Sequence, residues 1–123
     1  MGTKNRSFLS GLRHAVDGVA EGFRSERSMR IHCAAAMLVI AMGFLLGISA
    51  WEWIICVILI GLVIASELLN TALEHIVDIL MPELNPRAKC VKDTAAGGVL
   101  IVSLAAAAAG LIIFVPKLWN LLF

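Results

Sequence analysis

The sequence predicts an all-α integral membrane protein with three transmembrane helices and an N-terminal amphipathic helix on the membrane surface. Of its 123 residues, 60% are hydrophobic, whereas soluble domains are typically about 45–50% apolar. It also contains three apolar runs of roughly 16 to 30 residues, the range of lengths that crosses a bilayer. A soluble bundle of unusually apolar helices is the alternative, and the lengths of these runs disfavour it.

The N-terminal segment has the pattern of an amphipathic helix over residues 8–25. Apolar side chains recur at steps of three and four residues, and charged side chains fill much of the rest, which is typical of a helix with one apolar face. Beside membrane spans, such a helix is expected to lie on the membrane surface, although packing on a soluble partner stays open. Residues 1–7 are expected to lie outside the helix. The recurring apolar residues are Phe8, Leu12, Ala15, Val16, Val19 and Phe23.

Three spans are expected at about 31–48, 52–81 and 94–115, within one domain over residues 1–123. Trp51 and Trp53 begin the second span, as expected for interfacial anchors. Pro82 ends that helix, and Asn85-Pro86 indicates a loop. The third span is rich in Ala and Gly, which let helices approach closely in lipid.

The distribution of basic residues predicts how the spans are oriented. Nine of the ten Lys and Arg residues precede the first span or lie between the second and third. By the positive-inside rule these two regions are cytoplasmic, so that the hairpin at Ser49 and the C-terminus lie outside a cytoplasmic (inner) membrane. No interleaving of basic and aromatic residues suggests nucleic-acid binding.

A stripe of polar residues follows one side of the second span. On a helix, Glu67, Asn70, Glu74 and Asp78 fall within an arc of about 80°, and the other sides are Leu, Ile, Val and Ala. An ionised carboxylate in hydrocarbon is costly unless it is paired, hydrated or bound to a metal. The stripe is therefore a candidate functional site, opening towards the cytoplasm.

These residue types suit phosphoryl transfer from a nucleotide to a lipid alcohol. Carboxylates bind Mg²⁺, which bridges to phosphates, and the neighbouring basic residues can neutralise phosphate charge. A carboxylate near the hydrocarbon edge could accept the proton of a lipid hydroxyl. No Walker A loop is present. Two alternatives stay open at this point: a small proton- or ion-translocating subunit, and an assembly protein whose polar stripe joins helices.

Three motifs resemble those of the small prokaryotic diacylglycerol kinase and undecaprenol kinase family. They are residues 26–32 (ERSMRIH), 67–78 (ELLNTALEHIVD) and 88–99 (AKCVKDTAAGGV), and the similarity extends over about residues 8–115. The resemblance implies a homotrimer with active sites between neighbouring subunits at the cytoplasmic face. It also implies that ATP, with Mg²⁺, phosphorylates the hydroxyl of a membrane lipid.

The resemblance assigns roles by position. Glu67 matches the general base, Glu26 and Glu74 match the acids that hold the metal on the ATP phosphates, and Asn70 and Asp78 match supporting residues. Ser28 stands where the family often has Asn, and Ser7 aligns with an arginine that contacts nucleotide in some members. The remaining nucleotide contacts are expected from Lys92, Asp93, Glu83, Asn85, and from Arg6 and His14 of the N-terminal helix.

The lipid substrate is expected to be undecaprenol, with diacylglycerol as the alternative. The stretch from Glu26 to His32 and the spacing of Ala88, Lys89, Lys92 and Asp93 are more similar to the undecaprenol kinase branch. A hydroxyl at headgroup level is all that the chemistry requires. Nothing in the apolar runs distinguishes an acyl chain from a polyprenyl chain.

Overall fold

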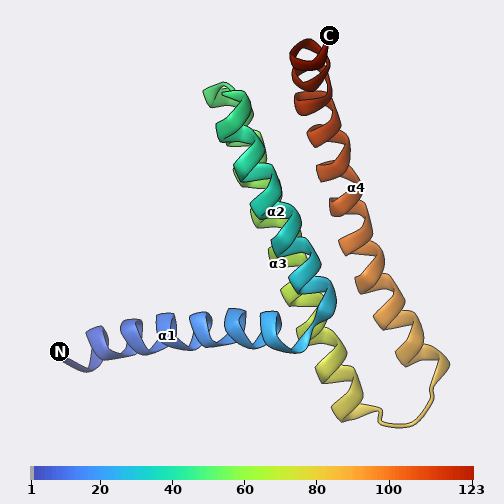
Figure 1. Cartoon of the computed structure of the whole chain (residues 1–123). Coiled ribbons are helices and arrows are strands. Elements are labelled where there is room, and N and C mark those ends of the chain that lie inside the picture. Colours follow the sequence, from blue (N-terminus) through green and yellow to red (C-terminus); the bar gives the residue numbers. More distant parts are fainter. Residues whose placement is uncertain (1) are drawn as a thin grey trace.

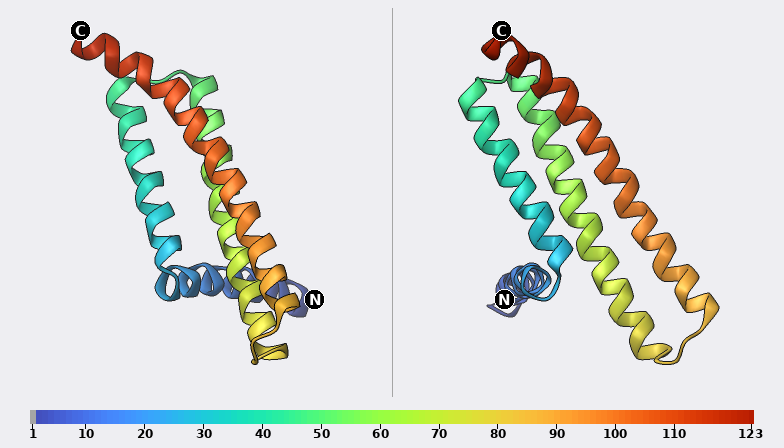
Figure 2. Two further views of the ribbon diagram at one scale, coloured as in Figure 1. Left: turned by 90° about the vertical axis from the view of Figure 1, so that its right-hand side faces the viewer. Right: turned by 45° about the vertical axis from the view of Figure 1, so that its right-hand side comes forward.

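The computed structural model describes residues 2–123, and it describes side chains from Ser7 onwards. Within this part of the chain the elements are α1 (Gly2–Ser25), α2 (Arg27–Leu46), α3 (Ala50–Leu80) and α4 (Pro86–Leu122). Helices α2, α3 and α4 run side by side, and α1 leaves one end of this bundle and runs across its direction (Figures 1 and 2). The turn at residues 47–49 and the C-terminus lie at the opposite end.

The predicted all-helical fold with three spans is confirmed. Each of α2, α3 and α4 is long and apolar enough to cross a membrane, with 20, 31 and 37 residues respectively. Most of the apolar side chains on these helices point away from the protein interior. A soluble protein would hide such a surface, whereas in a bilayer the lipid covers it.

One predicted boundary was wrong, and one helix extends beyond its predicted span. Residues 2–7 were expected to lie outside the first helix, but α1 already begins at Gly2. The third span was expected at about 94–115, and the helix that contains it begins earlier, at Pro86, where Asn85 accepts a hydrogen bond from the Arg87 N–H at 2.8 Å. Asn85-Pro86 is therefore an N-cap followed by a proline at the first helical position, which is a favourable start for a helix.

The elbow between α1 and α2 is held by the side chain of Arg30. Its Nη1 donates to the carbonyl oxygens of Phe23 at 3.3 Å and Arg24 at 2.8 Å. These carbonyls belong to the last turn of α1, where no N–H group of the same helix is available to donate to them. A cation there also interacts favourably with the negative end of the helix dipole. Gly22 is buried against the side chain of Leu68, so α1 also contacts α3. The start of α2 is thereby fixed against α3.

The hairpin between α2 and α3 closes the other end of the bundle. Gly47 ends α2 in the left-handed conformation, with φ at 61°. Ser49 then caps α3: its hydroxyl accepts from the Glu52 N–H at 3.3 Å, and the Glu52 carboxylate accepts from the Ser49 N–H at 2.9 Å. This reciprocal arrangement is a capping box. Lys117 near the end of α4 pairs with Glu52 at 3.2 Å, which joins α4 to the hairpin.

The hydrophobic core lies in the half of the bundle nearest this hairpin. Its buried centre is formed by Ile48, Cys56, Ile113 and Phe114, with partly buried neighbours from α2 and α3. Between the three spans lies an apolar cavity of about 560 Å³, which extends from His32 on α2 to Leu118 on α4. Buried polar side chains lie instead near the other end of the bundle, where α1, α2 and α3 meet.

Candidate functional site

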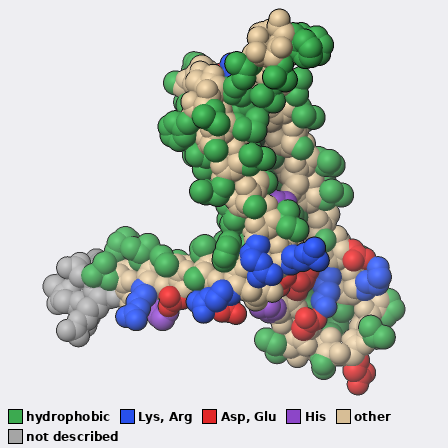
Figure 3. Space-filling view, viewed as in Figure 1, with side chains coloured by type: hydrophobic (Ala, Val, Ile, Leu, Met, Phe, Trp, Pro, Cys, Tyr) green, Lys and Arg blue, Asp and Glu red, His purple; other side chains and the backbone are tan. Residues whose placement is uncertain are grey.

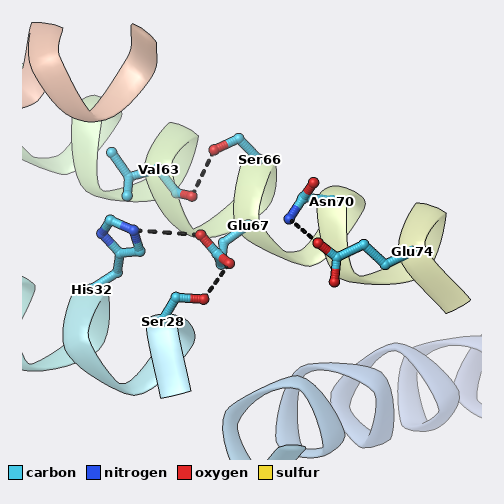
Figure 4. A network of polar contacts seen from close by, with 7 residues as sticks. All are labelled: Ser28, His32, Val63, Ser66, Glu67, Asn70 and Glu74. Atoms are coloured by element: carbon cyan, nitrogen blue, oxygen red, sulfur yellow. Dashed lines mark hydrogen bonds and ion pairs between the residues drawn. The ribbon is translucent and has the colours of Figure 1, made fainter. Parts of the chain in front are cut away.

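Glu67 is the buried acid at the centre of the candidate site. Only 4% of its surface is exposed, and α2 supplies contacts to both carboxylate oxygens. Ser28 Oγ donates to Glu67 Oε1 at 2.6 Å, and His32 Nε2 lies 3.4 Å from Glu67 Oε2 (Figure 4). A buried carboxylate needs such partners, because burial removes the water that would otherwise solvate it. The first acid of the polar stripe is therefore buried and has partners on both oxygens.

Asn70 and Glu74 continue the stripe along α3. Asn70 Nδ2 donates to Glu74 Oε1 at 3.2 Å, across one helical turn (Figure 4). Asn70 is buried and Glu74 is half-buried, while Asn70 Oδ1 is buried without a hydrogen-bond partner in the described part of the chain. A buried polar atom without a partner is uncommon and calls for an explanation such as a ligand or an ion.

Asp78 and the basic start of α4 form a second, more exposed group. Lys92 Nζ donates to Asp78 Oδ1, which joins α3 to α4 at the end of the stripe. One turn away, Lys89 Nζ donates to Asp93 Oδ2 at 2.6 Å. Lys92 and Asp93 are therefore near the stripe but already paired, each with a different partner.

The other predicted site residues lie around this end of the bundle. Glu26 is the N-cap residue of α2 in an extended conformation, yet its side chain makes no capping hydrogen bond. His14 is exposed on α1, and Glu83 is exposed in the loop between α3 and α4. Within the described chain, no hydrogen bond or ion pair connects the side chains of Glu26, His14 or Glu83 to the acids of α3. Arg6 lies outside the residues whose side chains are described.

Two residues that contact Glu67 were given no role from the sequence. Ser28 was noted only as a departure from the family pattern, and His32 only as the last residue of the first motif. Their spacing of four residues was a usable signal, because side chains at i and i+4 share a helix face. What the sequence could not show is that this face of α2 packs on the polar stripe of α3.

The donors at the site suit a hard cation. Glu74 and Asn70 present oxygen atoms, and Mg²⁺ in nucleotide sites is held by one or two carboxylates together with the substrate phosphates. Among the residues that the structure describes, no group of three or more His, Cys, Asp or Glu side chains is arranged to hold a metal alone. The buried Asn70 Oδ1 beside Glu74 is the observation that fits such an ion.

Comparison with known proteins places the chain among membrane kinases. It is 46% identical over 114 residues to the undecaprenol kinase of Bacillus subtilis, covering 93% of this chain and 92% of that protein. It is 36% identical to the diacylglycerol kinase of Synechocystis, covering 94% and 67%, and 30% identical to that of Haemophilus influenzae, covering 76% and 79%. The family model described as prokaryotic diacylglycerol kinase matches residues 13–114. These matches confirm the resemblance, and the chain belongs to the prokaryotic diacylglycerol kinase family.

Proposed function

We propose that this lipid kinase uses MgATP to phosphorylate the hydroxyl of undecaprenol, with Glu67 as the general base. The observation that carries the proposal is the buried, clamped carboxylate of Glu67 on a membrane-spanning helix, with Asn70 and Glu74 one and two turns further along. An acid at that depth can meet a lipid hydroxyl, and the more exposed end of the stripe can meet a soluble nucleotide. Kinase family membership favours this function over an ion-translocating subunit.

The reaction needs one proton transfer and one phosphoryl transfer. Glu67 accepts the proton of the lipid hydroxyl as the lipid oxygen forms a bond to the γ-phosphorus of ATP. The bond between that phosphorus and the β–γ bridging oxygen breaks, and ADP leaves with its electron pair. The products are the lipid phosphate and ADP, and Glu67 later releases its proton to water.

Glu74 and Glu26 are the proposed holders of Mg²⁺ on the ATP phosphates, with Asn70 supporting Glu74. The ion, when bound, neutralises charge on the transferring phosphate. Glu74 lies about 10 Å along the helix axis from Glu67, a span over which a γ-phosphate and a lipid hydroxyl can meet. Glu26 is half-buried at the start of α2 and its carboxylate is free of a capping bond.

The remaining nucleotide contacts stay predictions. Lys92 and Asp93 lie at the start of α4, and each would exchange its present partner for a nucleotide group. The Asn85 side chain caps α4, whereas the Glu83 side chain is exposed in the same loop. Arg6 and His14 would approach from α1. Asp78 is proposed to support the site through Lys92.

We propose that α1 lies on the cytoplasmic membrane surface. In Figure 3 its hydrophobic side chains gather on the side towards the spans, and its charged side chains gather on the opposite side. Lys and Arg also gather around the end of the bundle from which α1 leaves. An amphipathic helix at this level buries its apolar face between lipid headgroups. By the positive-inside rule this end is cytoplasmic and the C-terminus lies outside.

We further propose that the single domain over residues 1–123 assembles as a homotrimer, with each site completed by a neighbouring subunit. The exposed start of α4 and the open end of the α3 stripe leave room for a second chain beside Glu74. The small side chains of α4 suit close helix contacts in lipid.

A phosphate-transfer assay tests the substrate. Purified protein in lipid vesicles is given labelled MgATP and either undecaprenol or diacylglycerol, at matched mole fractions. We expect faster transfer to undecaprenol. Diacylglycerol is the second candidate, because two relatives at 36% and 30% identity are diacylglycerol kinases. A preference for diacylglycerol would reject the substrate assignment, and no transfer to either lipid would reject the kinase.

A further inference from the structure

Both oxygens of the Glu67 carboxylate are contacted by side chains from one turn of α2. The Ser28 hydroxyl donates to Oε1 at 2.6 Å, and His32 Nε2 lies 3.4 Å from Oε2. The first distance is in the range of hydrogen bonds from a hydroxyl to an ionised oxygen, which are short and strong. A carboxylate contacted on both oxygens is restricted in its rotation.

The turn of α2 that supplies these contacts is itself fixed. Met29, which follows Ser28, is 1% exposed. Arg30 binds the last carbonyls of α1. Ser28 and His32 are four residues apart, so they point to the same side of the helix, towards α3 (Figure 4). Because the elbow fixes this turn of α2, the two side chains that contact the Glu67 carboxylate are fixed as well.

His32 also separates the carboxylate from the apolar cavity between the spans. The imidazole lines one end of this cavity of about 560 Å³, and Ser103 is the one other polar residue among the lining residues. The side chain of Glu67 is 5% exposed and that of His32 is 23% exposed. The imidazole therefore shields a carboxylate that would otherwise border hydrocarbon, where an unpaired charge is costly.

We infer that Ser28 and His32 are positioning residues, which hold the Glu67 carboxylate in the orientation that accepts the proton of the lipid hydroxyl. This inference rests on the proposed function, because it takes Glu67 as the base. Neither residue exchanges a proton or a bond with the substrate. Their contribution is to keep the acceptor oxygen in line with the hydroxyl, since small misplacements of reacting groups reduce turnover strongly.

Matched substitutions separate positioning from packing. Ser28→Thr keeps the hydroxyl, whereas Ser28→Val has nearly the same shape without it. His32→Gln keeps a polar group that can donate, whereas His32→Met is apolar and of similar length. Turnover is measured as lipid phosphate formed per ATP-binding site, with the sites counted by titration with a non-hydrolysable ATP analogue. Unfolded protein then does not contribute to the rate.

We expect Ser28→Val and His32→Met to lower kcat by about ten- to a hundredfold while the KM for MgATP changes by less than about twofold. Ser28→Thr and His32→Gln should recover most of the loss. Ser66→Ala serves as the control, because the Ser66 hydroxyl donates to the Val63 carbonyl at 2.8 Å and does not contact the carboxylate. It should leave kcat unchanged.

The outcomes distinguish this inference from the proposed function. If Glu67→Gln is inactive but Ser28→Val and His32→Met keep wild-type kcat, the positioning role is wrong and the base assignment survives. Equal losses in both members of each matched pair would also overturn it, because packing alone would then explain the effect. If Glu67→Gln itself keeps wild-type kcat, the proposed base is wrong.

Discussion

Glu67 and Glu74 lie on one face of α3, but their surroundings differ. Glu67 is buried and held by two side chains of α2, whereas Glu74 is half-buried, and within the described part of the chain its carboxylate accepts one hydrogen bond, from Asn70. A carboxylate with partners on both oxygens, such as Glu67, is suited to act as a proton acceptor in a fixed orientation. A carboxylate that still has an oxygen atom available, such as Glu74, is suited to bind a metal ion. The two residues can thus divide the chemistry between the lipid and the nucleotide.

Replacing Glu74 tests the metal role at the residue scale. Glu74→Gln keeps the shape and the contact with Asn70 but removes the charge that would bind Mg²⁺. We expect the Kd for ATP in the presence of Mg²⁺ to rise by about tenfold or more, measured by isothermal titration, with little change when Mg²⁺ is left out. Glu21→Gln, at an exposed position on α1, is the control. An unchanged Mg²⁺ dependence in Glu74→Gln would contradict the metal assignment.

The sequence predicted the acids of α3 but not their partners. Glu67, Asn70 and Glu74 share a face because of helical periodicity, which is a local property that residue spacing reveals. Ser28 and His32 reach Glu67 across 39 and 35 positions of chain, respectively, because α2 packs on α3. That contact depends on the elbow at Arg30 and on tertiary packing, which a single sequence does not specify.

Each end of helix α2 is fixed by a different device. At its start, Arg30 caps the preceding helix α1. At its end, Gly43 allows the Trp53 ring of α3 to pack directly on the backbone, and Gly47 turns the chain. The position of α2 determines where Ser28 and His32 lie. By fixing the far end of α2, the hairpin therefore helps to position these two side chains at the site.

Gly43→Ala tests the hairpin at the element scale. A Cβ atom at Gly43 would lie 2.6 Å from a Trp53 ring atom and 3.1 Å from Ile48. Because an indole ring in this position cannot yield easily, we expect the free energy of unfolding to fall by about 1–3 kcal/mol, measured by denaturation in mixed micelles. Gly18→Ala, with open space around its position, should not destabilise. Equal stability of Gly43→Ala and wild type would show that this contact is loose.

Helix existence was predictable, whereas helix ends were less so. The three spans follow from apolar length, which is a strong signal. The polar residues at the start of α1 offer no apolar periodicity, so the pattern gave no reason to place them in a helix. Asn85-Pro86 has two meanings, a loop or an N-cap with its following proline, and the contact of Asn85 with the Arg87 N–H selects the second.

The whole molecule has one polar end and one apolar end. The acids of the candidate site, the elbow and most basic residues lie at one end, and the hydrophobic core and the Gly47 hairpin lie at the other. This asymmetry is what a kinase needs if it takes ATP from the cytoplasm and a lipid from the bilayer. The proposed trimer is the one part of this arrangement that depends on contacts between chains.

Cysteine labelling tests the proposed orientation. Cys90 is exposed at the start of α4, so a variant with Cys33 and Cys56 replaced by Ala leaves one reporter at the proposed cytoplasmic end. A membrane-impermeant maleimide should label it in inverted vesicles but not in intact cells. Ser49→Cys in a background without other cysteines should show the reverse. Labelling of Cys90 from outside intact cells would contradict the orientation.

The central claim is that Glu67 is the base that activates the lipid hydroxyl. Its most direct test is Glu67→Gln, compared with wild type for transfer of labelled phosphate from MgATP to undecaprenol and for binding of the nucleotide. The substitution keeps the size of the side chain and removes its ability to accept the proton. We expect turnover to fall by at least about a hundredfold, while the Kd for MgATP changes by less than about threefold. Near-normal turnover in Glu67→Gln would contradict the claim.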